Sequence, residues 1–585
     1  MEVLDIIQSF DNLNSRITRI ISSVRMHVKL SRKIKIEQFD HFCSSILYRM
    51  NKKIVSLNMS DEYSPGLIGR FNSKFSIDYF QNLKALTLNK VCGQELYSIL
   101  TKLHMLKQLI SLSINRDCDI RDEDNKMICQ IIFSNQLKLL KYCKLPFYRS
   151  EFSEKVTKND TLIIKKLSIG VYWFRDILLL FQHVPQIKDS RMQVCNERKS
   201  SSTRFLSNVL GNSLIGIQHL LTRFELSINN DYFSFGDIKS ILKYLPQLKQ
   251  FSFSALTCGF IYLFKGDSWE NMLSRYTPLL EKFSFYAECR IHRMKLHDYN
   301  INTDDMLSEF KTNYYFNHGW YFICDYYATY DSNRIVSIYT IPCHGKHFAV
   351  QSDTLESSTT ALLDSSFPPT VIYNKTESLH LLSKVMDNIQ NRRYSAVTSL
   401  RISRSYWQIK PQPITWSDTF LTEIQQLVVC SKLRRLSLCE NIDTKILIEI
   451  LTRSINVHTM DIECDILSKF LLSDSTLCSL INQMIKTLNL ELNDNLFKFD
   501  IVEEFCSKFS NIECLYINID TIDEIYLILP VLLTKLTHLT YLNVYYTGMG
   551  VFHLNHNIES WLEEKTQLSK EWIIDSNDYY LAIWI

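Results

Sequence analysis

The chain has 585 residues, of which 46% are hydrophobic and 22% charged, a composition typical of globular proteins and unlike that of disordered ones. Its 65 Lys and Arg residues nearly balance its 62 Asp and Glu residues, so the net charge of +3 implies no strongly basic surface and no nucleic-acid interface. Only 13 glycines are present, which disfavours the glycine-rich phosphate loops of nucleotide-binding folds.

The sequence also bears on the compartment. Its first residues lack the basic and then apolar regions of a signal peptide, and no uninterrupted apolar stretch of about 18 residues predicts a membrane span. The 16 cysteines are scattered without any Cys-x-x-Cys pair, and several occupy apolar positions of the repeated motif. We therefore expect buried free thiols in a reducing compartment, cytoplasmic or nuclear, with no membrane contact.

Residues 1–50 have a helical pattern, and we expect them to cap the open end of a repeat array that begins at residue 51.

From residue 51 to 290 a short apolar motif recurs, shown by Leu83-x-x-Leu86-x-Leu88. The other copies in this block begin at Ile54, Leu109, Leu137, Ile164, Leu221, Leu248 and Leu280, and a weak copy begins at Ile187. The first steps between copies are 29, 26, 28 and 27 residues, close to the unit length of about 20–29 residues of leucine-rich repeats.

Each unit combines two patterns. The last apolar residues of the motif alternate, which is typical of a strand with one buried face. Between the motifs lie segments such as 93–103, 235–245 and 444–454, whose apolar residues recur three and four apart as in amphipathic helices. One strand and one helix cannot bury both faces alone, so stacking of the units is expected to form a row of parallel strands inside and a row of helices outside.

The motif fails between residues 291 and 395. Residues 316–350 are rich in aromatic and β-branched residues and predict two or three antiparallel strands, whereas the Ser- and Thr-rich residues 351–370 predict a loop. We interpret the segment as an insertion that serves packing or partner contact, and that either splits one array or extends it.

The motif resumes in residues 396–547, and residues 548–585 end in an apolar run that predicts a second cap. The copies of this second block begin at Val397, Leu433, Val457, Ile485, Ile512 and Leu539. The predicted fold is thus an α/β, leucine-rich-repeat-like solenoid, a horseshoe of concave parallel strands and outer helices interrupted by an antiparallel hairpin. A purely helical solenoid is the alternative.

Strand alternation also predicts which side chains line the concave face, because Thr87 must point away from the side of Leu86 and Leu88. In the first block the corresponding residues are mostly small: Thr87, Ser113, Lys141, Ser168, Glu225, Ser252 and Ser284. The second block is richer in Tyr and Arg, which are enriched at binding hot spots. We therefore predict a partner-binding surface made by Arg401, Arg435, Ser437, Asp461, Glu463, Asn489, Glu491, Tyr516, Tyr541, Asn543 and Tyr545. An ordinary mixed polar surface is the alternative.

The segment from Ile7 to Ile21 resembles the C-terminal part of an F-box through Ile7, Phe10, Leu13, Asn14, Arg16 and Ile20. With the repeats downstream of it, the chain resembles the F-box/leucine-rich-repeat proteins, particularly the divergent invertebrate families. The resemblance implies a protein–protein interaction scaffold that recognises substrates for an SCF-type ubiquitin ligase through a Skp1-like adaptor. The Leu-Pro-x-Glu motif that opens an F-box is missing, which weakens the expected adaptor contact. The alternative is a leucine-rich-repeat scaffold without a ligase role, and in both cases we expect a monomer outside its complex.

No sequence signature of catalysis accompanies the repeats, so an enzyme is not expected. Nucleotide-loop, nucleophile-elbow and zinc-protease motifs are all absent from the sequence. Cys343, His344 and His347, and the pair His553 and His556, could ligate a metal, but residues of these types fit tight turns equally well. We therefore predict no metal and no cofactor.

Overall fold

We analysed a computed structural model of the chain. The structure describes residues 24–30, 36–61, 64, 66–91, 93–115, 122–133, 136–145, 162–171, 174–194, 220–228, 233–258, 261–291, 302–328, 334–342, 347–350, 354–361, 376–382, 393–403, 419–439, 442–490, 497–546, 558–566, 573–576 and 580–585. The protein is α/β, with two large and mostly parallel sheets, and in neither sheet do the described strands close into a barrel.

The first sheet is built from strands that pair in parallel and in chain order from β1 to β10. They are β1 (Met26–Leu30), β2 (Ile54–Ser60), β3 (Ala85–Asn89), β4 (Ser111–Asn115), β5 (Tyr142–Lys144), β6 (Lys166–Val171), β7 (Asp189–Val194), β8 (Arg223–Ile228), β9 (Gln250–Cys258) and β10 (Lys282–Ile291). Because β1 pairs in parallel with β2, the expectation that residues 1–50 are wholly helical is wrong for Met26–Leu30. Its alternating Met26, Val28 and Leu30 form a strand whose apolar side is buried.

Helices connect most of these strands. They are α3 (Ile36–His41), α4 (Tyr48–Met50), α5 (Leu67–Lys74), α6 (Gly93–Leu100), α7 (Asp122–Phe133), α8 (Phe174–His183), α10 (Phe235–Leu242) and α11 (Gly266–Tyr276). Two predicted helical segments are thus confirmed in α6 and α10, and α10 begins with a capping box between Ser234 and Asp237. Among the described residues, no helix is both long enough and apolar enough to cross a membrane.

The strand register tests the predicted motifs directly. Leu57 pairs with Leu86, and Leu86 pairs with Leu112, as the repeat requires. The motif placed at Leu137 is wrong by three residues, because Leu112 pairs with Cys143. Leu137 and Leu140 are both buried and both precede β5, so the sequence allows the motif to start at either leucine. The weak copy at Ile187 is confirmed as β7, in which a buried serine, Ser190, occupies the leucine position.

The predicted antiparallel hairpin is confirmed. Strands β11 (Tyr321–Ala328) and β12 (Arg334–Ile341) pair with each other, and β12 pairs antiparallel with β10. A third strand, β14 (Thr354–Thr359), pairs antiparallel with β11, so the prediction of a loop throughout residues 351–370 is wrong there. The hydroxyl-rich segment can form an edge strand because its side chains find partners on neighbouring elements.

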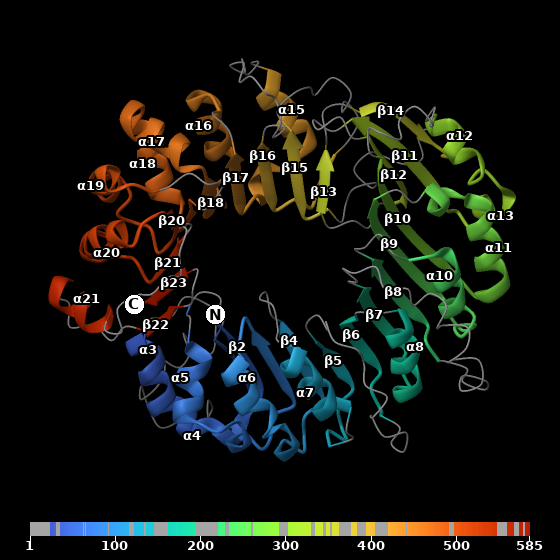
Figure 1. Ribbon diagram of the computed structural model, residues 1–585, viewed down its shortest axis with the longest axis horizontal. Helices are drawn as coiled ribbons and strands as arrows, with labels where there is room; N and C mark the ends of the chain where they lie inside the picture. The colour runs from blue at the N-terminus through green and yellow to red at the C-terminus, as the bar shows by residue number, and fades with distance from the viewer. Residues whose placement is uncertain are drawn as a thin grey trace.

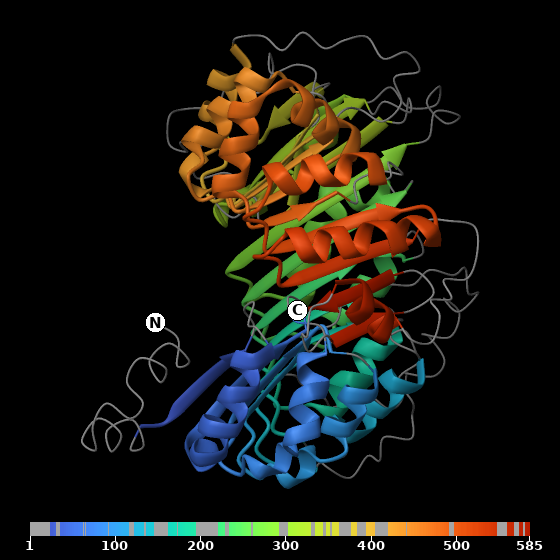
Figure 2. The same cartoon turned by 90° about the vertical axis from the view of Figure 1, so that its left-hand side faces the viewer.

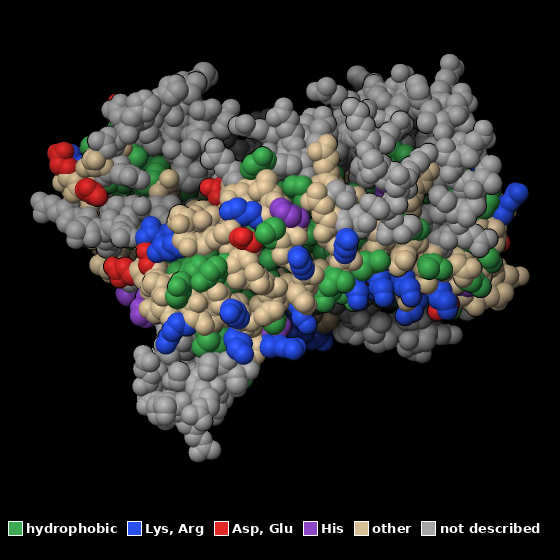
Figure 3. All heavy atoms as spheres, turned by 90° about the horizontal axis from the view of Figure 1, so that it is seen from below, with side chains coloured by type: hydrophobic (Ala, Val, Ile, Leu, Met, Phe, Trp, Pro, Cys, Tyr) green, Lys and Arg blue, Asp and Glu red, His purple; other side chains and the backbone are tan. Residues whose placement is uncertain are grey.

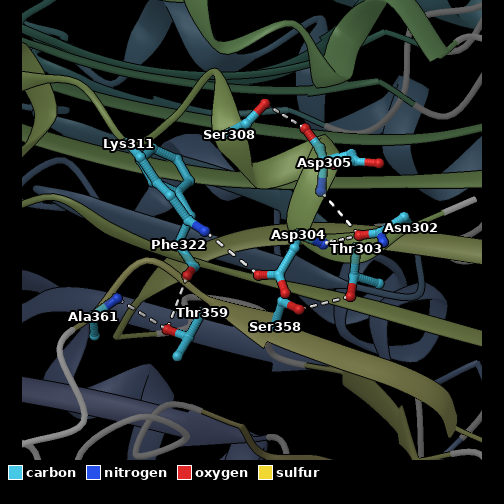
Figure 4. A network of polar contacts seen from close by, with 10 residues as sticks. All are labelled: Asn302, Thr303, Asp304, Asp305, Ser308, Lys311, Phe322, Ser358, Thr359 and Ala361. Atoms are coloured by element: carbon cyan, nitrogen blue, oxygen red, sulfur yellow. Dashed lines mark hydrogen bonds and ion pairs between the residues drawn. The ribbon is translucent and has the colours of Figure 1, made fainter.

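Figure 4 shows those partners around helix α12 (Thr303–Ser308), which precedes α13 (Asn313–Asn317). The side chain of Asn302 accepts hydrogen bonds from the first backbone N–H groups of α12 and caps the helix. The Thr303 and Ser358 hydroxyls lie 2.7 Å apart and link α12 to β14. The Thr359 hydroxyl donates to the Phe322 carbonyl at 3.1 Å, which ties β14 to β11.

The second sheet begins inside the segment interpreted as an insertion. Its strands are β13 (His347–Val350), β15 (Ser378–Leu382), β16 (Ser399–Ser403), β17 (Arg435–Cys439), β18 (Thr459–Ile462), β19 (Thr487–Asn489), β20 (Cys514–Ile519), β21 (Tyr541–Tyr546), β23 (Tyr580–Trp584) and β22 (Ile573–Ser576). They are parallel up to β21, and β23 and β22 then pair antiparallel at the edge. The boundaries 291–395 are therefore wrong for β13 and β15, where Leu379 pairs with Leu400 in a repeat register that the apolar motif does not predict.

The helices of this half are α15 (Thr419–Leu427), α16 (Thr444–Arg453), α17 (Cys464–Ser473), α18 (Ser475–Met484), α19 (Phe499–Lys508), α20 (Ile522–Lys535) and α21 (Ile558–Thr566). The helix predicted over 444–454 is confirmed in α16, whose Leu447, Ile450 and Leu451 are buried. These leucines and isoleucines face the apolar side of the sheet and form the second hydrophobic core.

The two halves form one curved arrangement in which strands lie inside and helices outside (Figure 1). The C-terminal strands β22 and β23 return to the first helices, as Figure 2 also shows. Contacts join the halves at both junctions: Trp584 belongs to the core of the first sheet, and Ile323 and Tyr339 belong to the core of the second. Both ends of the strand array are thus covered by packing.

Candidate functional site

The inner face of the second sheet carries the predicted partner-binding residues. In β17, Leu436 and Leu438 point to the helices, so Arg435 and Ser437 point to the opposite face. The strand pairings align one residue from each of seven strands into a continuous row across this face. We call it the inner row: His380, Arg401, Ser437, Asp461, Asn489, Tyr516 and Asn543.

A carboxylate is held at the centre of this row. Asp461 is only 2% exposed, and its Oδ2 accepts a hydrogen bond from Arg435 Nε at 2.6 Å while its Oδ1 accepts one from the terminal nitrogen at 2.8 Å. The Ser437 hydroxyl donates to the same carboxylate. The Arg435 side chain remains 51% exposed although Asp461 holds its guanidinium. Such a bidentate pair holds the arginine in one orientation.

Next to this network lies a second set of polar side chains from β15, β16 and β17. Burial lowers the pKa of His380 to about 4, and the neighbouring Arg401 charge adds to the effect, so the imidazole is neutral. Burial also raises the pKa of the Cys439 thiol, whereas a hydrogen bond and the charge of Arg401 oppose the rise. Within the described part of the chain, the buried Arg401 Nε has no hydrogen-bond partner.

Aromatic side chains occupy the other end of the face. Tyr516 and Tyr541 pack edge to face with ring centroids 5.4 Å apart, and Tyr541 is buried beside Cys514 and Ala582. Tyr545 is 37% exposed at the end of β21. Rings fixed in this way present apolar area and hydroxyl groups at a small entropic cost of ordering.

Most of the predicted residues lie together on this face. Arg401, Ser437, Asp461, Asn489, Tyr516 and Asn543 fall in the inner row, and Arg435, Glu463, Tyr541 and Tyr545 flank it on the same strands or directly after them. Glu491 lies outside the described residues, as do the F-box-like positions Ile7, Phe10, Leu13, Asn14, Arg16 and Ile20.

The prediction missed one residue of the row and misplaced another. His380 was missed because its unit starts with a buried threonine, Thr376, in place of an apolar residue. A search that admitted threonine at the first position would have found it. In the first sheet, Lys144 rather than Lys141 pairs with Ser113, since the motif there is shifted by three residues.

The candidate metal ligands at Cys343, His344, His553 and His556 lie outside the described residues. In the part of the chain that is described, no group of three or more His, Cys, Asp and Glu side chains is arranged to hold a metal ion. The cysteines whose surroundings are described are buried and free of disulfides. The groups described on the inner face are hydrogen-bonding side chains and aromatic rings.

Comparison with known proteins adds no family to this description: no protein-family model matches the chain, and no curated protein matches its sequence.

Proposed function

We propose that the protein is a protein–protein interaction scaffold, a leucine-rich-repeat-type solenoid that binds a protein partner on the inner face of its second sheet. The observation that carries the proposal is the inner row, in which seven parallel strands align polar and aromatic side chains across one face. Repeat arrays use such extended faces for binding, because stacking supplies a broad surface without a deep pocket.

The composition of the face supports recognition of a folded protein surface. Arginine and tyrosine contribute strongly at interfaces when their geometry is fixed before binding. Arg435 is held by the buried Asp461 and still exposes half of its side chain. Tyr516 is held against Tyr541. Side chains that are already held in place lose less conformational entropy on binding than side chains that move freely.

The test is affinity capture with the full chain followed by quantitative mass spectrometry. The variant Arg435→Ala/Tyr545→Ala should lose a defined set of partners that the wild type retains. The matched control is Tyr97→Ala on α6, a residue that is 54% exposed on the helix side. Equal partner sets for the wild type and the inner-face variant would remove this face from the proposal.

A more specific role is suggested by the resemblance of residues 7–21 to an F-box. In that role, the scaffold presents a bound substrate to an SCF-type ubiquitin ligase through a Skp1-like adaptor. The alternative role is the same scaffold without a ligase. Capture of Skp1 and a cullin by the wild type, and their loss in Phe10→Ala/Leu13→Ala, would support the ligase role. Recovery of partners that depend on the inner face without Skp1 or a cullin would support the alternative.

A further inference from the structure

A row of lysines runs along one edge of the first sheet. Each of these residues directly precedes a strand and occupies the same position of its repeat. The Lys141 N–H donates to the Ile110 carbonyl at 2.8 Å, the Lys165 N–H to the Lys141 carbonyl at 2.9 Å, and the Lys188 N–H to the Lys165 carbonyl at 2.9 Å. We define the lysine row as Lys84, Lys141, Lys165, Lys188 and Lys249. On the same ladder Ile110 stands between Lys84 and Lys141, Thr222 stands between Lys188 and Lys249, and Glu281 follows Lys249.

Three members of the row directly precede the consecutive strands β5, β6 and β7. Neighbouring strands are about 4.8 Å apart, so the backbones of Lys141, Lys165 and Lys188 succeed one another at that spacing. Lys165 and Lys188 are exposed, and Lys141 is half-buried. Stacking like charges at this spacing is unfavourable for the isolated protein, and the repeat itself does not require it.

The repeat does not require lysine because the second sheet has a different set of residues at the same position. The corresponding backbone ladder there passes through Thr398, Arg434, His458, Lys486 and Glu513. Lysine occurs once among these five positions, and Lys486 pairs with the next residue of the ladder, Glu513, at 3.4 Å. The run of three consecutive lysines, Lys141, Lys165 and Lys188, is therefore found on the first ladder and not at these positions of the second.

Nearby carboxylates do not neutralise the row. Lys249 pairs with Glu281 at 2.8 Å. Asp189 lies between Lys166 and Arg223, at 3.2 and 3.4 Å. Within the described part of the chain, no salt bridge reaches the remaining members of the row, which are Lys84, Lys141, Lys165 and Lys188.

Figure 3 views the molecule from the side that carries the first helices, and Lys and Arg side chains succeed one another there along the lower part of the described surface. The net charge of +3 says nothing about how Lys and Arg are distributed over the surface. Net charge sums over the whole chain, whereas the repeat gathers onto one edge residues that are far apart in sequence, from Lys84 to Lys249.

We propose that the lysine row binds an extended, carboxylate-rich segment of a protein partner. An extended peptide places every second side chain about 6.6 Å apart, a spacing that flexible lysine stems on adjacent strands can match. Asp189 and Glu281 lie beside the row and would repel a uniform polyanion such as a nucleic acid. A peptide with spaced Asp and Glu residues can avoid them. This proposal does not depend on the inner face of the second sheet.

The test uses the full chain and a fluorescein-labelled peptide of alternating Glu and Ser residues, with binding measured by fluorescence anisotropy at low and high salt. Lys141→Glu/Lys165→Glu/Lys188→Glu should weaken binding at least about tenfold, because three charge contacts of modest strength are reversed. The corresponding triple Lys→Gln variant should lose less peptide affinity than the Glu variant. It tests the same lysines if the Glu variant fails to fold. Raising the salt concentration should weaken wild-type binding.

The matched control reverses three exposed lysines that lie away from the row, Lys239, Lys445 and Lys498, and keeps the same net charge as the test variant. Its peptide affinity should stay within about twofold of the wild type, since screening makes distant surface charges weak. Equal losses in the two variants, or no peptide binding by the wild type, would overturn the proposal. The proposal would also be overturned if a single-stranded oligonucleotide bound more tightly than the peptide and lost affinity in the same triple Lys→Glu variant. The row would then be assigned to nucleic acid. Retained peptide binding by Arg435→Ala/Tyr545→Ala is expected and separates this edge from the inner face.

Discussion

The indole ring of Trp584 lies edge-on against the phenyl ring of Phe39, with their centroids 6.1 Å apart. Both side chains are fully buried. This contact joins a strand of the second sheet to the first helix described in the chain, so the apolar ends of the two sheets cover each other. Leucine at either position would leave part of this space unfilled.

Replacing Trp584 by alanine should lower the free energy of unfolding by about 3–5 kcal/mol, because a large buried ring is removed and a cavity remains. Urea denaturation followed by circular dichroism measures the change. A double-mutant cycle with Phe39→Ala should give a coupling of about 0.5–1.5 kcal/mol beyond the separate losses. Tyr97→Ala, at an exposed position, is the control and should change stability by less than about 0.5 kcal/mol. A loss of similar size in the control would contradict the assignment.

The pair Arg435 and Asp461 should respond asymmetrically to substitution. Arg435→Ala leaves a buried carboxylate without its charged partner, at a cost of about 2–3 kcal/mol, because such groups are poorly solvated. In Asp461→Ala the remaining guanidinium is half-exposed and can be hydrated, so the loss should be smaller. The double variant should be more stable than Arg435→Ala alone. Thermal and urea unfolding of the three variants provide the comparison, and equal losses for the two single variants would show that burial of Asp461 is unimportant.

His380 should make stability depend on pH between about 6.5 and 4. The unfolded chain binds a proton near pH 6.5, whereas burial lowers the folded pKa to about 4. Between these values the unfolded chain binds more protons, so stability is fully present above pH 6.5 and is lost as the pH falls through this window. The loss should be on the order of 2–3 kcal/mol, since one pKa unit corresponds to about 1.4 kcal/mol.

The measurement is urea unfolding at several pH values for the wild type and His380→Gln. The variant cannot take up this proton, so the difference in stability between the two proteins should narrow or reverse as the pH falls from 6.5 to 4. Parallel pH profiles would contradict a neutral, half-buried His380.

Gly266 should not tolerate a side chain. A Cβ built there would lie 2.3 Å from the Glu309 carbonyl oxygen, and the Gly266 carbonyl itself accepts a hydrogen bond from the Tyr315 hydroxyl at 2.6 Å. Gly266→Ala should therefore cost about 1–3 kcal/mol through overpacking against backbone that cannot move freely. The control is Gly236→Ala in the first turn of α10, where the nearest atom is 3.4 Å away and alanine favours the helix. Thermal unfolding of both variants measures the difference, and equal midpoints would contradict the close approach at Gly266.

The sequence alone determined the strand–helix repeat and most of its register. Alternation at Leu86 and Leu88 specifies one buried face, and the spacing of Leu447, Ile450 and Leu451 specifies a helix. These local signals fail where the motif can start at either of two buried residues, as at Leu137 and Leu140. They also fail where a threonine replaces the first apolar residue of the motif, as at Thr376. The inner-row residues were mostly predictable because their place depends on alternation alone.

Only the tertiary structure decided what those residues contact. The burial of Asp461 beneath Arg435 depends on the pairing of two strands, with the two residues 26 positions apart in sequence, and the lysine row depends on the register of several strands. The contact between Phe39 and Trp584 depends on the accumulated curvature of both sheets. Small rotations between neighbouring strands add up over the whole array, and no short stretch of sequence encodes their sum.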